Sequence, residues 1–208
     1  MEKSLSNYLI PENIKGKSSD VEHSIKLDTL EQARSVYRTA CERLLNVNAW
    51  HELSGFASAH FELKDQDGHE SKGMAIVGNY VQIDIPGPGP DAGNGYDWVK
   101  VEAIESGEAD AAADEESMGM RLKSCKNPLE NTSDTAHFFT NDATSTLIIQ
   151  RENTTVTASH HGRNEVINTD TEKVKDKIRN TIIGAGALVG LSEMQWGRLI
   201  KSFLEKES

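Results

Sequence analysis

Four histidines offer the clearest chances for chemistry in this sequence: His23, His60, His160 and His161. Each lies where polar and apolar residues alternate, a pattern typical of a half-buried β-strand. By this alternation His23 and His160 share a face with apolar neighbours, whereas His60 and His161 take the opposite face. A histidine inside an apolar cavity can hydrogen-bond a ligand carbonyl or act as a general base. We therefore take His23 and His160 as candidate ligand-binding residues, with a hydrogen-bonded core histidine as the alternative interpretation.

Other kinds of site fit the sequence less well. A metal site built from His137, His160 and His161 is disfavoured because adjacent strand residues point to opposite faces. The many Ser, His and Asp residues allow several triads, but no G-x-S-x-G nucleophile elbow singles one out. The glycines of Gly184–Gly190 do not match a dinucleotide fingerprint, because a helical pattern precedes them and the third glycine comes one place late. We predict neither a metal nor a cofactor.

The charge distribution narrows the range of partners. The net charge is -11, and seven acidic residues with no basic residue lie between Glu102 and Glu116. Since no basic patch appears elsewhere, nucleic acid and an anionic membrane surface are not expected partners. No run of 18 apolar residues is present, and the N-terminus lacks an apolar signal core. With only Cys41 and Cys125, both expected as free thiols, the chain is predicted to be cytoplasmic.

Two helical stretches must position these residues. The stretch Asp170–Lys206 contains apolar residues at spacings of three and four, including Trp196 and Phe203, which predicts a long amphipathic helix. An earlier helix is predicted over residues 28–46, with Asp28 as its N-cap and Glu31 completing a capping box. The predicted strand regions are 21–27, 56–63, 74–85, 96–104, 118–122, 136–151 and 155–161.

Three segments between or before these elements have loop-like composition. Residues 1–19 are predicted to form a polar N-terminal arm, in which Tyr8–Ile10 can dock on the body of the protein. The Pro/Gly-rich residues 86–95 predict a rigid loop at the rim of the sheet, or alternatively a lid. The acidic residues 105–117 predict a solubilising loop.

The order of elements resembles a known superfamily. The residues that carry the resemblance are the strand Val21–Leu27, the helix after it, and the segment Asn46–Leu53 with Trp50. This order resembles the START-like helix-grip superfamily, which includes the birch-pollen-allergen and polyketide-cyclase-like proteins. The resemblance implies a curved antiparallel sheet that grips the C-terminal helix around a cavity. It also implies that the chain binds hydrophobic small molecules, transfers lipids, performs cyclase chemistry or acts as a co-chaperone-like module.

These observations predict one α+β domain over residues 20–208. We expect about seven strands in a curved antiparallel sheet that grips a long C-terminal helix, with another helix after the first strand. An apolar small molecule is the expected partner. The candidate ligand-binding residues are His23, His160, Phe61, Trp98 and Arg121.

Two alternatives remain open at this point. The first is an enzyme of cyclase, hydratase or hydrolase type that uses His23 or His160. The second is a protein-interaction module that works through Trp98 and the acidic loop. Exposure of Trp98, which lies on the polar face of its predicted strand, separates the second alternative from the others.

Overall fold

The structure, a computed structural model, describes residues 5–54, 59–84, 96–107, 114–130, 139–167 and 182–205, with the backbone alone for residues 7 and 182–192. Its helices are α1 (Leu5–Leu9), α2 (Leu30–Leu45), the short 3-10 helix η1 (Val47–Ala49), α3 (Trp50–Ser54) and α5 (Ile182–Leu204). Its strands are β1 (Lys17–Lys26), β2 (His60–Lys64), β3 (Tyr80–Asp84), β4 (Asp97–Gly107), β5 (Glu115–Ser124), β6 (Thr144–Glu152) and β7 (Thr155–Glu165).

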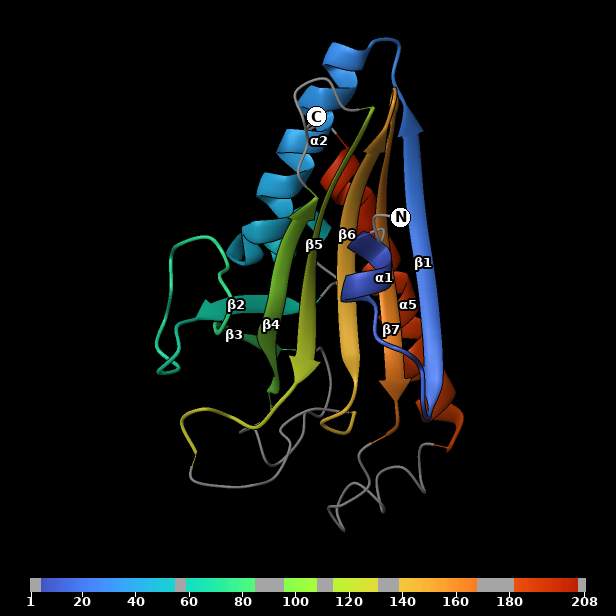
Figure 1. Ribbon diagram of the computed structural model, residues 1–208. Coiled ribbons are helices and arrows are strands. Elements are labelled where there is room, and N and C mark those ends of the chain that lie inside the picture. Colours follow the sequence, from blue (N-terminus) through green and yellow to red (C-terminus); the bar gives the residue numbers. More distant parts are fainter. Residues whose placement is uncertain are drawn as a thin grey trace.

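The seven strands form one antiparallel sheet in the order β1-β7-β6-β5-β4-β3-β2. In Figure 1, β2 and β3 run across the view while the other strands run lengthwise, so the sheet is strongly curved. Helices α2 and α5 cover one face, which we call the inner face, and α1 lies on the other, the outer face. This arrangement confirms the predicted helix-grip fold with a helix after the first strand.

Helix α2 begins one residue later than predicted. Its N-cap is Thr29 and not Asp28: the Thr29 hydroxyl accepts a hydrogen bond from the Gln32 backbone N–H at 3.2 Å. The Gln32 side chain in turn accepts from the Thr29 N–H at 3.3 Å, which completes a capping box. After α2 the chain forms η1 and α3, and Trp50 at the start of α3 is completely buried.

The core fills the space between the inner face and the two long helices. Because side chains alternate along a strand, every second residue of the sheet faces this space. Side chains buried there include Tyr37 and Leu44 of α2, Val101 of β4, Leu122 of β5, Leu147 and Ile149 of β6, Val156 of β7, and Leu199 and Phe203 of α5. The C-terminal half of α5 is therefore held by apolar burial on one stripe, as its spacing predicted.

The predicted acidic loop is shorter than its composition suggested. Strand β4 continues to Gly107 and β5 already begins at Glu115, so Glu105 and Glu116 belong to strands. Pairing with β6 overrides the local like-charge repulsion, because Glu116 forms an ion pair with the buried Arg151 of β6. The remaining loop residues 108–113, and the Pro/Gly-rich residues 86–95, lie outside the described residues.

Helix α1 packs on the outer face through Leu9, which is completely buried. The Leu9 carbonyl accepts a hydrogen bond from Arg121 of β5 at 3.0 Å. Beneath it lies Gly119, where an added Cβ would come within 2.5 Å of Leu9 Cδ1. A glycine at this position therefore lets the helix approach the strand closely.

Truncation of this contact is expected to destabilise the protein. We expect Leu9→Ala to lower the free energy of unfolding by about 2–5 kcal/mol, because it removes a buried side chain and leaves a cavity. Urea denaturation followed by circular dichroism measures the change. Tyr8→Ala, at a side chain that is 65% exposed, is the matched control and should change it by about 0.5 kcal/mol or less. Equal effects of the two substitutions would contradict the packing role of α1.

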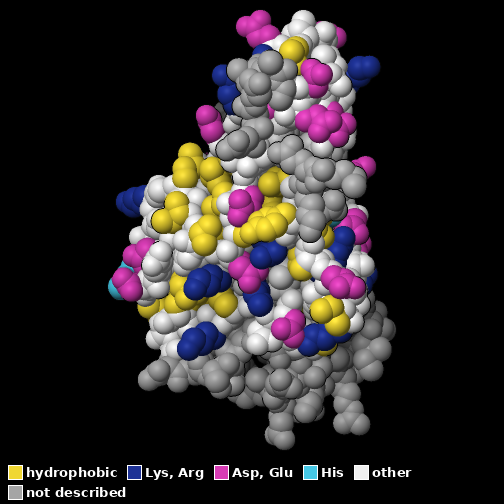
Figure 2. Space-filling view, viewed as in Figure 1, with side chains coloured by type: hydrophobic (Ala, Val, Ile, Leu, Met, Phe, Trp, Pro, Cys, Tyr) yellow, Lys and Arg dark blue, Asp and Glu magenta, His cyan; other side chains and the backbone are white. Residues whose placement is uncertain are grey.

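Charges of both signs are interspersed over the described part of the outer face (Figure 2). Lysine and arginine side chains alternate there with aspartate and glutamate and do not form a field of one sign. Among the described residues, no helix combines the length and the apolar character needed to cross a membrane.

Candidate functional site

The inner face holds a cluster of aromatic rings centred on Trp196 of α5. Its ring centroid lies 6.3 Å from that of Phe61, 6.4 Å from that of Trp50, and 4.4 Å from that of His160. The His160 ring is stacked on Trp196, with 10° between the two planes. Trp196 thus bridges the inner face from β2 to β7 and joins Phe61 to His160.

His160 is the most unusual side chain in this cluster. It lies on β7, opposite Val21 of β1 and Leu147 of β6, and its side chain is 0% exposed. Burial lowers the pKa of His160 to about 3, so its ring is neutral at pH 7. Neither ring nitrogen has a hydrogen-bond partner within the described part of the chain. A neutral imidazole carries one donor and one acceptor, and here both are buried without a partner among the described residues.

The structure brings three of the five predicted site residues to the inner face. Phe61 and His160 meet the same ring, that of Trp196. His23 lies on the inner face of β1, opposite Ala158, two residues along the strand from the partner of His160. It is only partly buried, so it lies toward the edge of the sheet.

Trp98 and Arg121 are on the outer face, and the structure places neither of them at this site. Trp98 pairs with Gln82, whereas its neighbour Val99 belongs to the core. Trp98 is nevertheless only 2% exposed, so it is not available as a surface for a partner protein. Arg121 is held by Glu102 at 2.7 Å and by the carbonyl of Leu9. Its strand position is opposite in parity to that of Leu122, which faces the core.

Comparison with known proteins adds little to this picture. No protein-family model matches the sequence, and no curated protein matches it.

Solved structures that are similar in the arrangement of their elements include the following three. Norcoclaurine synthase from Thalictrum flavum aligns over 99% of this chain and 94% of its own, with 12% identity and a TM-score of 0.37. Ara h 8.0201 aligns over 91% and 100%, with 8% identity and a TM-score of 0.38. A protein from Staphylococcus epidermidis, solved by solution NMR, aligns over 96% and 97%, with 12% identity and a TM-score of 0.29. These scores are low, and the fold assignment rests on the strand order and helix placement themselves.

Two hollows lie within the described part of the protein, and the second is lined in part by Phe61 of the aromatic cluster. An internal space of about 10 Å³, enough for one water molecule, is lined by Val99, Leu122, Ser124, Phe139, Ala143, Thr144, Ser145 and Glu165. Burial raises the pKa of Glu165, which lines this space. A larger open groove of about 410 Å³ lies along the edge strand β2 and is lined by Asn46, Asn48, His60, Phe61, Glu62, Leu63, Glu70, Ser71 and Lys72. Phe61 lines this groove, and its ring centroid lies 6.3 Å from that of Trp196.

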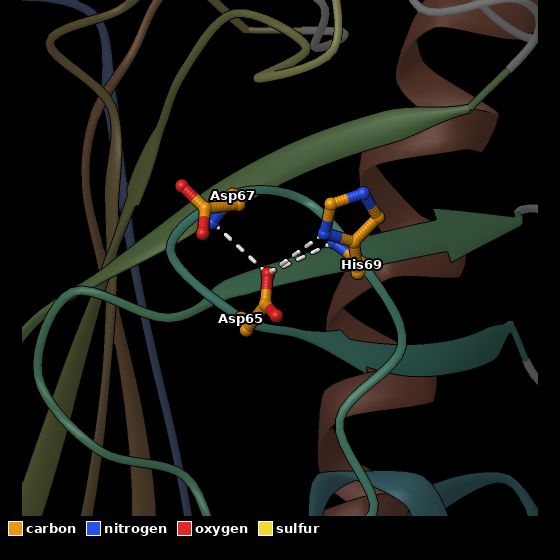
Figure 3. Close-up of side chains that lie close together, drawn as sticks. All are labelled: Asp65, Asp67 and His69. Atoms are coloured by element: carbon orange, nitrogen blue, oxygen red, sulfur yellow. Dashed lines mark hydrogen bonds and ion pairs between the residues drawn. The ribbon is translucent and has the colours of Figure 1, made fainter.

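The turn at Asp65–His69 gathers two carboxylates and an imidazole, but the chain's own backbone occupies the central carboxylate (Figure 3). Asp65 Oδ1 accepts hydrogen bonds from the backbone N–H groups of His69 and Asp67, both at 2.9 Å. The hydrogen bond from His69 is the main reason that the pKa of Asp65 is lowered. This geometry is that of a side chain that closes a turn.

Sequence reasoning missed the role of Trp196 and Trp50. Trp196 was visible only as one member of the apolar stripe of the C-terminal helix, beside Leu199 and Phe203. Its stacking on His160 depends on how that helix lies across the sheet, and no local spacing encodes that position.

Proposed function

We propose that this protein binds a hydrophobic small molecule between the inner face of the sheet and α5, with His160 as the polar contact. The observation that carries the proposal is the imidazole of His160, completely buried and without a hydrogen-bond partner in the described residues. A ligand carbonyl or hydroxyl oxygen beside one of the ring nitrogens would supply the missing hydrogen-bond partner.

The energetic argument is that buried polar groups in proteins nearly always have a hydrogen-bond partner. Leaving one unpaired costs about 1–3 kcal/mol, and such groups in native proteins call for an explanation. The surroundings favour an apolar partner that carries one polar atom. The flat face of Trp196 lies 4.4 Å from His160, and Phe61 and Trp50 continue the apolar surface. Ligand pockets typically combine such aromatic walls with a few polar groups.

The groove beside β2 is the approach that we propose for the ligand. Its volume of about 410 Å³ suits a small ligand, whereas the internal space of about 10 Å³ does not. Phe61 forms part of the groove wall, and its ring centroid lies 6.3 Å from that of Trp196. We infer that rotation of Phe61 connects the groove with the surroundings of His160.

Two observations weigh against the alternative functions. A general base works best with a pKa near the working pH, and the pKa of about 3 makes His160 a weak base at pH 7. An interaction surface built on Trp98 would need that ring at the surface, but it is buried. Binding therefore agrees better with the geometry than catalysis by His160 or docking through Trp98.

Native mass spectrometry of the purified protein, beside the denatured mass, tests the proposal directly. Extra mass that is lost on denaturation would be the retained ligand. Titration with 8-anilinonaphthalene-1-sulfonate and with a long-chain fatty acid, followed by quenching of tryptophan fluorescence, extends the test to exchangeable ligands.

His160→Leu is the decisive variant, because it keeps apolar volume and removes both ring nitrogens. We expect about tenfold weaker binding of a carbonyl-containing ligand, which corresponds to about 1.4 kcal/mol for one hydrogen bond. His69→Leu, in the turn and 75% exposed, is the matched control and should bind as the unaltered protein does. A bare native mass, together with no probe binding or equal binding by both variants, would refute the proposal.

A further inference from the structure

Three side chains on the outer face of the β1–β7 pair form a continuous line of hydrogen bonds. Asp20 Oδ1 lies 2.5 Å from Nδ1 of His161, and His161 Nε2 lies 3.0 Å from the hydroxyl oxygen of Ser159. The order carboxylate, imidazole, hydroxyl is that of the triads that activate serine in hydrolases. Because it lies on the outer face, this cluster is separate from the site around His160.

Sheet geometry explains why these residues meet. Asp20 of β1 is directly opposite His161 of β7 in the antiparallel register. Ser159 precedes His161 by two residues on the same strand, so its side chain emerges on the same face. Sequence analysis placed His161 on this face, but the partner from β1, 141 residues away, depends on pairing of the first strand with the last.

The neighbours of Asp20 stabilise the ionised form of its carboxylate. Burial alone would raise the pKa of Asp20, but hydrogen bonds from Arg163 and His161 outweigh burial and lower it. The Arg163 guanidinium donates to Asp20 Oδ1 at 2.8 Å and to the carbonyl of Gly162 at 2.7 Å. An ionised carboxylate can only accept, so Nδ1 of His161 carries the proton. With the proton on Nδ1, Nε2 can accept a hydrogen bond from the Ser159 hydroxyl, 3.0 Å away.

We propose that Ser159 is a nucleophile, that His161 is its general base, and that Asp20 is a positioning residue, with an uncharged activated ester as the substrate class. In the first step the Ser159 oxygen bonds to the ester carbonyl carbon while His161 Nε2 takes the hydroxyl proton. The tetrahedral adduct then collapses, the bond to the leaving alkoxide breaks, and the alkoxide receives the proton from Nε2. Water attacks the acyl-Ser159 in the same way, releasing the carboxylic acid and restoring the hydroxyl.

The surroundings of Ser159 limit both the substrate and the rate. The apolar Ile148 lies directly opposite Ser159 on β6, and the exposed Glu22 lies opposite it on β1. The carboxylate of Glu22 disfavours anionic substrates, and the 9% exposure of Ser159 admits only small ones. Since β7 lies between β6 and β1, its amides are engaged in the two ladders and do not form an oxyanion hole. Acylation is therefore expected to be much faster with activated electrophiles than turnover of ordinary esters.

A fluorophosphonate probe tests the nucleophile without relying on turnover. A bond from the Ser159 oxygen to phosphorus forms, the P–F bond breaks, and fluoride leaves with the proton held on His161. We expect peptide mapping of the labelled, folded protein to place the adduct on Ser159. Ser159→Ala should abolish this adduct, and His161→Gln should slow its formation by about 100-fold. Ser24→Ala is the matched control: its hydroxyl is on the same face of β1 but bonds Thr157 at 2.8 Å, so labelling should not change.

Asp20→Asn tests the positioning role and should slow labelling by at least about tenfold. The ¹⁵N NMR signals of His161 give an independent readout, since the protonated nitrogen should be Nδ1 in the unaltered protein and change in the variant. Circular dichroism and urea midpoints confirm that each variant is folded. Absence of labelling at Ser159, or a His161→Gln variant that labels at the unaltered rate, would overturn the inference and leave a structural hydrogen-bond ladder. The labelled hydroxyl is on the outer face, so this test does not depend on ligand binding at the inner face.

Discussion

Arg151→Met is expected to lower the free energy of unfolding by about 3–5 kcal/mol, because it leaves an acidic partner and two carbonyls without their donor. The Arg151 side chain is 0% exposed, which is rare for a charged residue. Its Nε donates to the Glu116 carboxylate, and one terminal nitrogen donates to the carbonyls of Asn153 at 2.9 Å and Asp114 at 3.1 Å. This one residue therefore ties the beginning of β5 to the turn between β6 and β7.

The double variant Arg151→Met with Glu116→Leu tests how much of the loss in stability comes from the charge of Glu116 that Arg151→Met leaves unpaired. Replacing both partners of a buried pair with apolar groups leaves no uncompensated charge, so the double variant should be more stable than Arg151→Met alone. Urea denaturation at pH 7 of the unaltered protein, both single variants and the double variant gives the coupling energy. Lys201→Met, at an exposed ion pair with Glu205, is a control that should cost about 1 kcal/mol or less. A cost below about 1 kcal/mol for Arg151→Met would contradict the anchoring role.

Acidification from pH 7 to pH 5 is expected to lower the free energy of unfolding by about 2 kcal/mol through the titration of His160 alone. The pKa of His160 is about 3 in the folded chain, against an ordinary value of 6.5. Between these two values the unfolded chain binds a proton that the folded chain does not. The contribution to stability is therefore complete above pH 6.5 and is lost as the pH falls toward 3. Burial is the main cause of the shift, with smaller effects from His161, Asp20 and Arg163.

His160→Leu removes this titration and provides the comparison. The variant should be at least as stable as the unaltered protein at pH 7, since an apolar side chain replaces a buried polar one that has no partner in the described part of the chain. The difference in unfolding free energy between the two proteins should then grow by about 2 kcal/mol in favour of the variant at pH 5. Urea midpoints at the two pH values measure it, and carboxylates common to both proteins cancel. An unchanged difference would mean that His160 gains a partner or is hydrated in solution.

The stability of the His160→Leu variant at pH 7 and at pH 5 indicates whether His160 serves folding or ligand binding. If leucine stabilises the chain, the histidine is unfavourable for folding and its retention is explained by a ligand that satisfies the ring nitrogens. The stability measurement and the binding titration with the same variant thus test one hypothesis from two sides.

Local patterns in the sequence determined much of the framework. The alternation of Val21, His23 and Ile25 predicted β1 and the face on which His23 lies, and the stripe from Trp196 to Phe203 predicted the buried side of α5. These signals depend only on the periods of strand and helix, which each segment carries by itself. The order of elements then sufficed to predict an antiparallel sheet that grips a C-terminal helix.

Tertiary structure alone decided which side chains meet. The acidic segment reads as a loop from its charges, yet Glu116 enters β5 because Arg151 of β6 is opposite it. Trp98 was expected to be either a cavity residue or an exposed contact, and the fold buries it on the outer face. The stacking of His160 on Trp196 and the line Asp20–His161–Ser159 both join segments from opposite ends of the chain. Such contacts follow from strand register and helix placement, which the free energy of the whole fold sets and no local period encodes.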